Sequence, residues 1–155
     1  PRMRFDLTIN HFTKSFLDER ILKIYDQKTS RPYCHVLDFA RAIKKVIESE
    51  VKKIDMQIFN VGDNKNNFFK KEIVDKISKY IKKPEILFLK KGVDKRNYRV
   101  DFRKINRILK FKPKYSVDYG IKEISKFIIS YKQKKTEWLT LSIANESLKV
   151  LRHGW

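Results

Sequence analysis

Tyr131 and Lys135 have a spacing that is typical of proton-transfer chemistry. In a Tyr-x-x-x-Lys pair the positive charge of the lysine lowers the pKa of the tyrosine, which can then act as a general base. The pair lies in the stretch YKQKK (131–135), where lysine stands at nearly every position. Chance explains this spacing better than catalysis does, and we predict no catalytic residue in this chain.

Glycine is too sparse for a dinucleotide-binding loop. Transfer of a hydride to NAD requires a glycine-rich turn between a strand and a helix, where the backbone can approach the pyrophosphate. The chain has four glycines, and no two of them lie close together: Gly62, Gly92, Gly120 and Gly154. We therefore predict that the chain alone binds no NAD.

Cys34 and His35 stand side by side, but their surroundings do not suggest a metal site. Cys34 is the only cysteine, which excludes an internal disulfide and a multi-cysteine metal site. No second histidine or acid lies at ligand spacing from either residue. We expect Cys34 to be a small buried apolar residue and predict no bound metal.

The charge of the chain is strongly positive. Its 37 basic and 18 acidic residues give a net charge of +19, a field that attracts polyanions such as nucleic acids. The lysines are nevertheless spread through every segment, with no Cys/His finger, basic leucine zipper or aromatic RNA-binding motif. The chain is also rich in Ile, Asn, Phe and Tyr, whose codons are AT-rich like those of lysine. We favour a lysine-coated surface encoded by an AT-rich genome over a nucleic-acid-binding function.

Alternating helix and strand patterns predict an α/β domain. Apolar residues recur at helical spacing in five segments, namely 6–20, 38–50, 68–82, 101–109 and 116–131. Short apolar or alternating runs predict strands at 21–25, 33–36, 56–61 and 85–90. In the second helix we expect one apolar face made of Phe39, Ala40, Ile43, Val46 and Ile47. Ser116 is the expected N-cap of the last helix.

The length and hydropathy of the chain place limits on its class. A chain of 155 residues suffices for about one domain with a modest core. Its apolar runs are far shorter than a membrane span, and we expect a reduced, cytoplasmic protein without membrane contact. Residues 132–135 are basic, whereas 136–155 are poor in lysine and contain both tryptophans. This tail fits either an added amphipathic helix or sequence foreign to the domain, so we divide the chain into 1–131 and 132–155.

Four segments, in order, resemble the C-terminal part of the extended short-chain dehydrogenase/reductase family. The likeness is to its NAD-dependent nucleotide-sugar epimerases and dehydratases, and it covers about residues 1–131. The segments are PRMRFDLTIN (1–10), RPYCHVLDFARAI (31–43), FNVGDN (59–64) and RNYRVDFRKINRILKFKPKYSVDYGIKE (96–123). The second is close to the family pattern R-(D/P)-(F/Y)-x-H-V-x-D-x-A-x-A-I, and the fourth to R-x-Y-x-x-D-x-x-K-x-x-x-x-L-G-(F/W)-x-P.

The resemblance implies how this chain holds a nucleotide-diphosphate sugar. Arg31 and Arg96 are the implied contacts to phosphate or nucleotide, because a guanidinium fork binds two phosphate oxygens at once. Asn10 corresponds to a substrate-contacting asparagine, and Arg99 is a second candidate for phosphate. Three further residues are expected to shape the site: His35, which orients the Arg31 loop, and Asn60 and Gly62, which form the turn after a strand. The structural alternative for each arginine is a surface salt bridge.

Two departures from the family pattern affect local geometry. Relatives have Gly-Asp-Gly before the first arginine, whereas this chain has DQKTS at 26–30. The loss of two glycines removes positions that tolerate positive φ, so this turn is expected to differ in shape. Lys110 stands where relatives have a glycine after the leucine of the last block.

The sequence thus predicts the small C-terminal lobe of an extended short-chain dehydrogenase/reductase, without a complete Rossmann domain. Its implied role is to bind the nucleotide sugar, while NAD and the catalytic Tyr-x-x-x-Lys belong to an N-terminal half that this chain lacks. The lobe is expected to be inactive alone. Two alternatives stay open at this stage: a basic nucleic-acid-binding module and a decayed, non-functional fragment.

Overall fold

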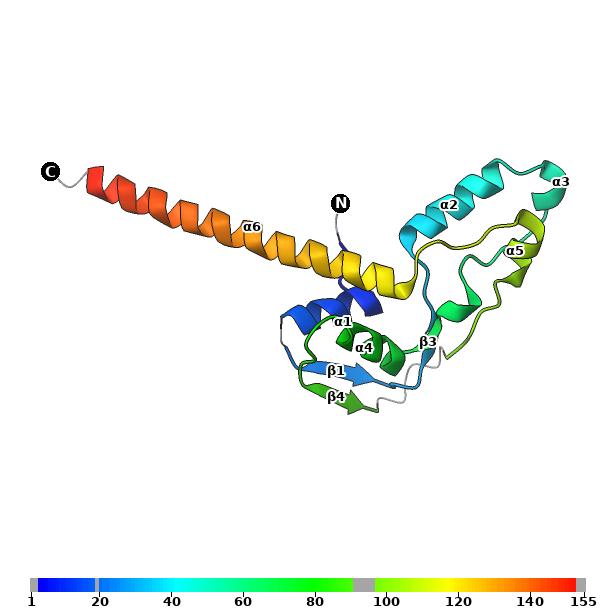
Figure 1. Cartoon of the computed structure of the whole chain (residues 1–155), viewed down its shortest axis with the longest axis horizontal. Coiled ribbons are helices and arrows are strands. Elements are labelled where there is room, and N and C mark those ends of the chain that lie inside the picture. Colours follow the sequence, from blue (N-terminus) through cyan, green and yellow to red (C-terminus); the bar gives the residue numbers. More distant parts are fainter. Residues whose placement is uncertain (1–2, 19, 91–96, 153–155) are drawn as a thin grey trace.

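Helices cover two small two-stranded sheets in this α/β chain (Figure 1). The computed structural model describes residues 3–18, 20–90 and 97–152, with side chains as far as residue 134. The elements in chain order are α1 (Thr8–Leu17), β1 (Leu22–Tyr25), β2 (Ser30–Pro32), α2 (Val36–Ile47), α3 (Val51–Ile54), the 3₁₀ turn η1 (Asn64–Asn66), β3 (Asn67–Phe69), α4 (Lys70–Ser78), β4 (Ile86–Leu89), α5 (Arg103–Leu109) and α6 (Val117–Arg152). The predicted α/β class and the alternation of short strands with helices are confirmed.

The larger hydrophobic core lies between α1, α4, the start of α6 and one face of β1. Leu22 and Ile24 of β1 point into it, whereas Lys23 and Tyr25 alternate outward, as a half-buried strand requires. β1 pairs in parallel with β4, and Leu22 lies opposite Ile86. The helices contribute the remaining fully packed side chains: Phe12, Phe16, Ile73, Val74, Ile77, Val117 and Ile121.

A second, smaller core joins α2, α5 and the segment 58–61. Ala42 of α2 is almost completely buried against Ile105 and Leu109 of α5 and against Phe111. Val46, Phe59 and Val61 pack around them. In Figure 1 these elements lie together at the end of the molecule away from the tip of α6.

A buried carboxylate connects this second core to the start of α6. The side chain of Asp38 in α2 is fully buried and accepts hydrogen bonds from the backbone N–H groups of Lys114 (2.9 Å) and Tyr115 (2.8 Å). The Arg41 guanidinium donates a third bond to it, at 2.5 Å. Buried charges persist only when paired and hydrogen-bonded, and Asp38 meets both conditions. It fixes the path of the chain into α6.

Asparagine side chains hold the segment 97–103 beside β3. Asn67, which is buried, donates to the carbonyl of Val100 (3.0 Å) and accepts from the same residue's N–H (2.9 Å). Asn64 accepts from the N–H of Phe102 at 2.8 Å. These bonds satisfy backbone groups that would otherwise need a partner strand.

Most of the predicted helices are confirmed, with ends shifted by a few residues, but the strand prediction at 33–36 is wrong. The strand is Ser30–Pro32, paired antiparallel with Asn67–Phe69. His35 instead caps α2, because its ring nitrogen accepts from the N–H of Leu37 at 3.3 Å. A histidine that turns the chain into a helix cannot also lie within a strand.

The prediction of a strand at 56–61 is also wrong. Met56 lies in a turn with a φ of 51°, and residues 57–61 form no strand in the described part of the chain. On α2 the residues Phe39, Ile43 and Ile47 of the predicted apolar face are exposed, whereas Val46 packs with Ala42 on the second core. Most of this apolar face is therefore open to solvent.

The last helix begins as predicted and continues much further. The Oγ atom of Ser116 accepts from the N–H of Tyr119 at 3.1 Å, which caps α6. The helix then runs without a break through residue 131 to Arg152 and extends away from the rest of the molecule (Figure 1). None of the described helices combines the length and the apolar character that crossing a membrane requires.

We predict that Asp38→Asn lowers the free energy of unfolding by about 2–4 kcal/mol, because an amide cannot accept from both N–H groups and removes the negative charge that pairs with Arg41. Urea unfolding followed by circular dichroism measures the change. Asp75→Asn, an equally conservative change at an exposed position of α4, is the control and is expected to change stability by less than about 0.5 kcal/mol. Equal effects of the two substitutions would contradict the role of Asp38.

Candidate functional site

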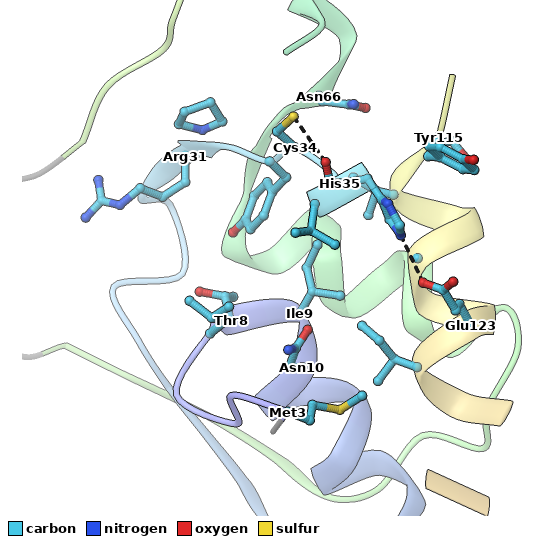
Figure 2. Close-up of a pocket in the computed structure, with 18 residues that line it drawn as sticks. Met3, Thr8, Ile9, Asn10, Arg31, Cys34, His35, Asn66, Tyr115 and Glu123 are labelled. Carbon is cyan, nitrogen blue, oxygen red and sulfur yellow. Dashed lines mark hydrogen bonds and ion pairs between the residues drawn. The ribbon is translucent and has the colours of Figure 1, made fainter. Parts of the chain in front are cut away.

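A pocket of about 520 Å³ lies between the start of α1, the chain from β2 into α2, and the first turns of α6 (Figure 2). Its walls are largely apolar, with Leu7, Ile9, Val36 and Val117 among the lining residues. Polar residues from the different elements also line it, among them Asn10, Arg31, His35, Asn66 and Glu123. An apolar cavity with a few convergent polar groups is the usual form of a small-molecule site.

Asn10 and Arg31, two of the residues predicted from the sequence, both line this pocket. Asn10 lies in the first turn of α1, where its amide donates to the carbonyl of Arg4 at 2.9 Å. Arg31 is in the middle of β2, opposite Phe68 of β3. The fold thus brings together two positions that are 21 residues apart in the sequence.

The guanidinium of Arg31 contacts Tyr98 and the backbone of Ser30. It lies 5.1 Å from the ring centre of Tyr98, a cation–π distance, and donates to the carbonyl of Ser30 at 3.3 Å. Tyr98 is positioned in turn because the N–H of Ser30 donates to the side chain of Asn97 at 2.9 Å. Figure 2 shows the guanidinium at the opposite side of the site from Glu123 and directed away from it.

The two other predicted arginines stand differently. Arg96 lies outside the described residues. Arg99 is exposed and does not line the pocket. Its neighbour Tyr98 contacts Arg31.

His35 connects α2 to α6 at the edge of the pocket. Its Nε2 lies 2.9 Å from a carboxylate oxygen of Glu123, and its ring contacts those of Tyr115 and Tyr119 at 4.8 Å and 5.6 Å between centroids. Because Nδ1 accepts from Leu37, Nε2 carries the proton and donates to Glu123. His35 therefore orients Glu123 and the helix start, whereas the sequence predicted that it orients the Arg31 loop.

Asn60 and Gly62 lie away from the pocket, at the contact between segment 58–61 and α5. Asn60 donates to the carbonyl of Asp101 at 3.3 Å. At Gly62 an added Cβ would stand 2.7 Å from two ring carbons of Phe102. Glycine is needed there because the Phe102 ring occupies the space of a side chain.

Cys34 lines the pocket and is exposed, contrary to the expectation that it is buried. Burial of the sulfur and, to a smaller extent, the carboxylate of Asp38 raise the pKa of this thiol to about 11. The Sγ atom lies 3.6 Å from the carbonyl oxygen of His35. At neutral pH Cys34 is thus a neutral thiol and a poor nucleophile.

The pocket residues at the start of α6 were not predicted from the sequence. Ser116, Gly120 and Glu123 line the pocket at spacings of four and three residues, so they follow one edge of the apolar stripe of this helix. Tyr33 was also missed, and burial raises the pKa of its phenol, which remains a neutral hydrogen-bond donor at pH 7. Small and polar residues recur at helical spacing beside the predicted apolar face of this helix, and this pattern could have indicated the pocket residues.

The described residues do not suit a metal or NAD. Nowhere in the described part of the chain do three His, Cys, Asp or Glu side chains come together in a way that could hold a metal ion. NAD requires a glycine-rich turn between a strand and a helix. The glycines within the described ranges are Gly62, which packs on Phe102, and Gly120, which lies inside α6. Neither forms such a turn, so no step through the cofactor is assigned to this chain.

The charges of the pocket favour a ligand with two different ends. Arg31 offers a cation at one end, and Glu123 offers a carboxylate at the other, with apolar walls between them (Figure 2). A guanidinium binds anionic oxygens, whereas carboxylate and amide oxygens accept from hydroxyl groups. An elongated molecule with an anionic part and a hydroxyl-bearing part fits this distribution.

Comparison with known proteins relates the chain to a part of larger enzymes. No protein-family model matches it. An uncharacterised protein of Methanocaldococcus jannaschii is 25% identical over 139 residues, which are 88% of this chain and 40% of that protein. The chain therefore spans about two fifths of the length of this relative.

The chain also covers about two fifths of the length of solved enzyme structures that it resembles. UDP-glucuronic acid 4-epimerase from Bacillus cereus, in complex with UDP-glucuronic acid and NAD, is 24% identical with a TM-score of 0.70, over 84% of this chain and 42% of the enzyme. UDP-glucose 4-epimerase from Thermotoga maritima, with UDP-glucose, is 25% identical with a TM-score of 0.65, over 81% and 40%. The chain thus has the fold of a part of NAD-dependent nucleotide-sugar epimerases, in support of the resemblance found in the sequence.

We predict opposite effects of adding a methyl group at the two described glycines. Gly62→Ala is expected to lower the free energy of unfolding by about 1–3 kcal/mol, because the new Cβ collides with Phe102. Gly120→Ala is expected to raise it by about 0.5–1 kcal/mol, since the nearest atom of His35 is at 3.5 Å and alanine favours the helix. Urea titration of both variants tests this, and a stabilising Gly62→Ala would contradict the close contact.

Cys34 is predicted to react slowly with iodoacetamide. Raising its pKa from 9.0 to about 11 lowers the thiolate fraction at pH 8 about 100-fold, and the greater nucleophilicity of the more basic thiolate recovers part of this, leaving a rate about 10-fold below that of a free cysteine. The rate should continue to rise between pH 9 and 11. Mass spectrometry follows the labelling, and a rate that levels off below pH 9 would contradict the raised pKa.

Proposed function

We propose that this chain is the substrate-binding part of an NAD-dependent nucleotide-sugar epimerase or dehydratase. The observation that supports this most directly is the pocket, which brings Asn10 and Arg31 together in a fold shared with enzymes whose structures contain UDP-sugars. The proposed ligand is a nucleotide-diphosphate sugar. The proposed activity, epimerisation or dehydration of that sugar, is that of the whole enzyme and not of this chain alone.

The diphosphate is assigned to the Arg31 side of the pocket. A guanidinium donates two parallel hydrogen bonds to phosphate oxygens, and its face remains stacked on Tyr98 while it does so. Tyr98 restricts the arginine, which reduces the entropy lost when the ligand binds. Arg96 is proposed as a second phosphate contact on the resemblance alone, and Arg99, exposed outside the pocket, is the weaker candidate.

The sugar hydroxyl groups are assigned to the side formed by Asn10 and Glu123. The Glu123 carboxylate, held by His35 at 2.9 Å, can accept from a hydroxyl through its other oxygen. Asn10 lies on α1, across the pocket from α6, in Figure 2. The apolar residues between the two ends, such as Ile9 and Val36, exclude water from the ligand.

The redox step is proposed to belong to a cofactor-binding half that lies outside these 155 residues. The chain has no glycine-rich turn for a pyrophosphate, and its Tyr131-x-x-x-Lys135 spacing falls on the exposed side of α6 at Tyr131. We therefore expect binding without turnover from the chain alone, in the cytoplasm, where nucleotide sugars are available to such enzymes. The base and the sugar are left open, as is the choice between epimerisation and dehydration.

We predict that Arg31→Ala weakens binding of UDP-glucose by about 1–3 kcal/mol, or about 5- to 150-fold, the usual cost of a lost charge-assisted contact. Titration calorimetry or the NMR shifts of pocket residues measure the affinity. Arg107→Ala, which removes the same charge from an exposed position of α5, is the control and should change the affinity less than about 2-fold. Arg96→Ala is expected to behave like Arg31→Ala, and unchanged binding by both would refute the assignment.

The same titration separates this function from nucleic-acid binding. A chain with a net charge of +19 associates with DNA through counterion release, and its affinity for a duplex falls steeply with salt. If the pocket is the functional site, UDP-glucose binding persists at salt concentrations that abolish the association with DNA. Binding to DNA alone, unaffected by UDP-glucose, would favour the basic-module hypothesis.

A further inference from the structure

A cleft of about 370 Å³ lies between the second half of α2 and the turn that follows α5. It has no lining residue in common with the pocket at the start of α1. Seven described residues line the cleft, and five of them are cationic: Arg41, Lys44, Lys45, Lys110 and Lys112. The other two are Glu48 and Phe111. Cations gathered in a concave site attract anions more strongly than lysines spread over a convex surface.

The guanidinium of Arg41 is held by one of its three nitrogens. Its Nη1 donates to the buried carboxylate of Asp38 at 2.5 Å and to the carbonyl of Lys112 at 3.5 Å. The group also lies 5.6 Å from the ring centre of Phe111, a cation–π distance. No described residue accepts a hydrogen bond from Nε or Nη2, and the side chain is 44% exposed. These two nitrogens donate in parallel, which is the geometry that binds two oxygens of one phosphate.

Three lysines of the cleft are without a counter-charge in the described part of the chain. Lys44 lies 3.6 Å from the carboxylate of Glu48. Lys45, Lys110 and Lys112 are exposed, and no described carboxylate forms an ion pair with them. Like charges that are held close together repel one another. A small anion with several charges removes this repulsion, because it is attracted to each ammonium group at once.

The backbone of Lys110 gives independent support for a ligand at this place. The residue ends α5 in the left-handed conformation, with a φ of 52° and a ψ of 28°. Glycine adopts this conformation without steric penalty and is the usual residue at such a helix end. Local structure therefore does not explain a lysine here, whereas the ammonium group that it adds to the cleft does.

We propose that this cleft binds a compact polyphosphate group, either an inorganic polyphosphate or the triphosphate of a nucleotide. Arg41 binds two oxygens of one phosphate through Nε and Nη2, and the ammonium groups of Lys45, Lys110 and Lys112 neutralise the other charges. The site is separate from the pocket that contains Arg31. Its existence is also independent of the proposed function.

The size of the cleft favours a small anion over a nucleic acid. Its volume of about 370 Å³ is near the lower end of the range of small-molecule sites, which is roughly 300–1,000 Å³. A DNA duplex carries its charges in a row along the helix axis and therefore needs an extended basic surface. Here the cations come from two short segments, 41–45 and 110–112, that face one cleft.

NMR titration of the full chain with inorganic tripolyphosphate, at about 150 mM KCl to screen weak surface contacts, tests the site. The amide signals of residues 44–48 and 110–112 and the Nε–H signal of Arg41 are expected to shift. The titration is repeated with Arg31→Ala, which removes the cation of the other pocket, and the affinity is expected to stay the same. Loss of binding in this variant would overturn the proposal, because the anion would then occupy the other pocket.

Two substitutions in the cleft separate binding from folding. Lys45→Gln is expected to weaken tripolyphosphate binding about 5- to 10-fold, whereas Lys71→Gln, the same change at an exposed position of α4, should alter it less than about 2-fold. Lys110→Gly should weaken binding to a similar extent but keep or raise the urea midpoint, since glycine suits the left-handed backbone. Affinity that is unchanged in both cleft variants would overturn the proposal.

ATP and a short DNA duplex distinguish the sources of the phosphate. ATP is expected to bind about as tightly as tripolyphosphate, because the Phe111 ring is buried and offers no exposed face to a base. ATP that binds more than about 10-fold tighter, the effect of a stacked base, would instead identify a nucleotide as the ligand. Duplex DNA that binds at the cleft while tripolyphosphate does not would overturn the proposal in favour of a nucleic-acid site.

Discussion

The fully buried carboxylate of Asp38 is the interaction on which the arrangement of the pocket depends. A charge removed from water is tolerated only when its hydrogen-bonding capacity is used, and Asp38 uses it on two backbone N–H groups and one guanidinium. Because those N–H groups belong to Lys114 and Tyr115, the chain must enter α6 close to α2. This brings Glu123 within reach of His35, which caps the same α2. One side chain thus links the second core, the helix start and a wall of the pocket.

Where the sheets are too small to pair with a segment of the chain, side chains form hydrogen bonds to the backbone of that segment instead. The described strands form only two pairs, of which β1–β4 is parallel and β2–β3 antiparallel. Asn64 and Asn67 bind the backbone of residues 100–102, so that the segment carrying Tyr98 follows β3 without forming a ladder. Tyr98 then stacks on Arg31. The position of the candidate phosphate-binding arginine therefore depends on two amides that carry no charge.

The sequence predicted those parts of the fold whose apolar pattern is satisfied within this chain. α1, α4 and the start of α6 bury the faces that their helical spacing indicates, through residues such as Phe16, Ile77 and Ile121. The strand prediction at 33–36 was wrong because the cap formed by His35 cannot be read from the spacing of apolar residues. Of the candidate site, Asn10 and Arg31 were placed in one pocket, but only through resemblance to a family. Glu123 was missed because its role depends on a contact between residues 88 positions apart.

The exposed face of α2 and the missing strand at 56–61 have a different physical cause. An apolar pattern shows that a face is suited to burial, but not which polypeptide buries it. The pattern of Phe39, Ile43 and Ile47 is unambiguous, yet these residues are exposed, and so is Ile58. α2 thus carries Asp38 and His35 on the side that supports the pocket wall and an open apolar face on another.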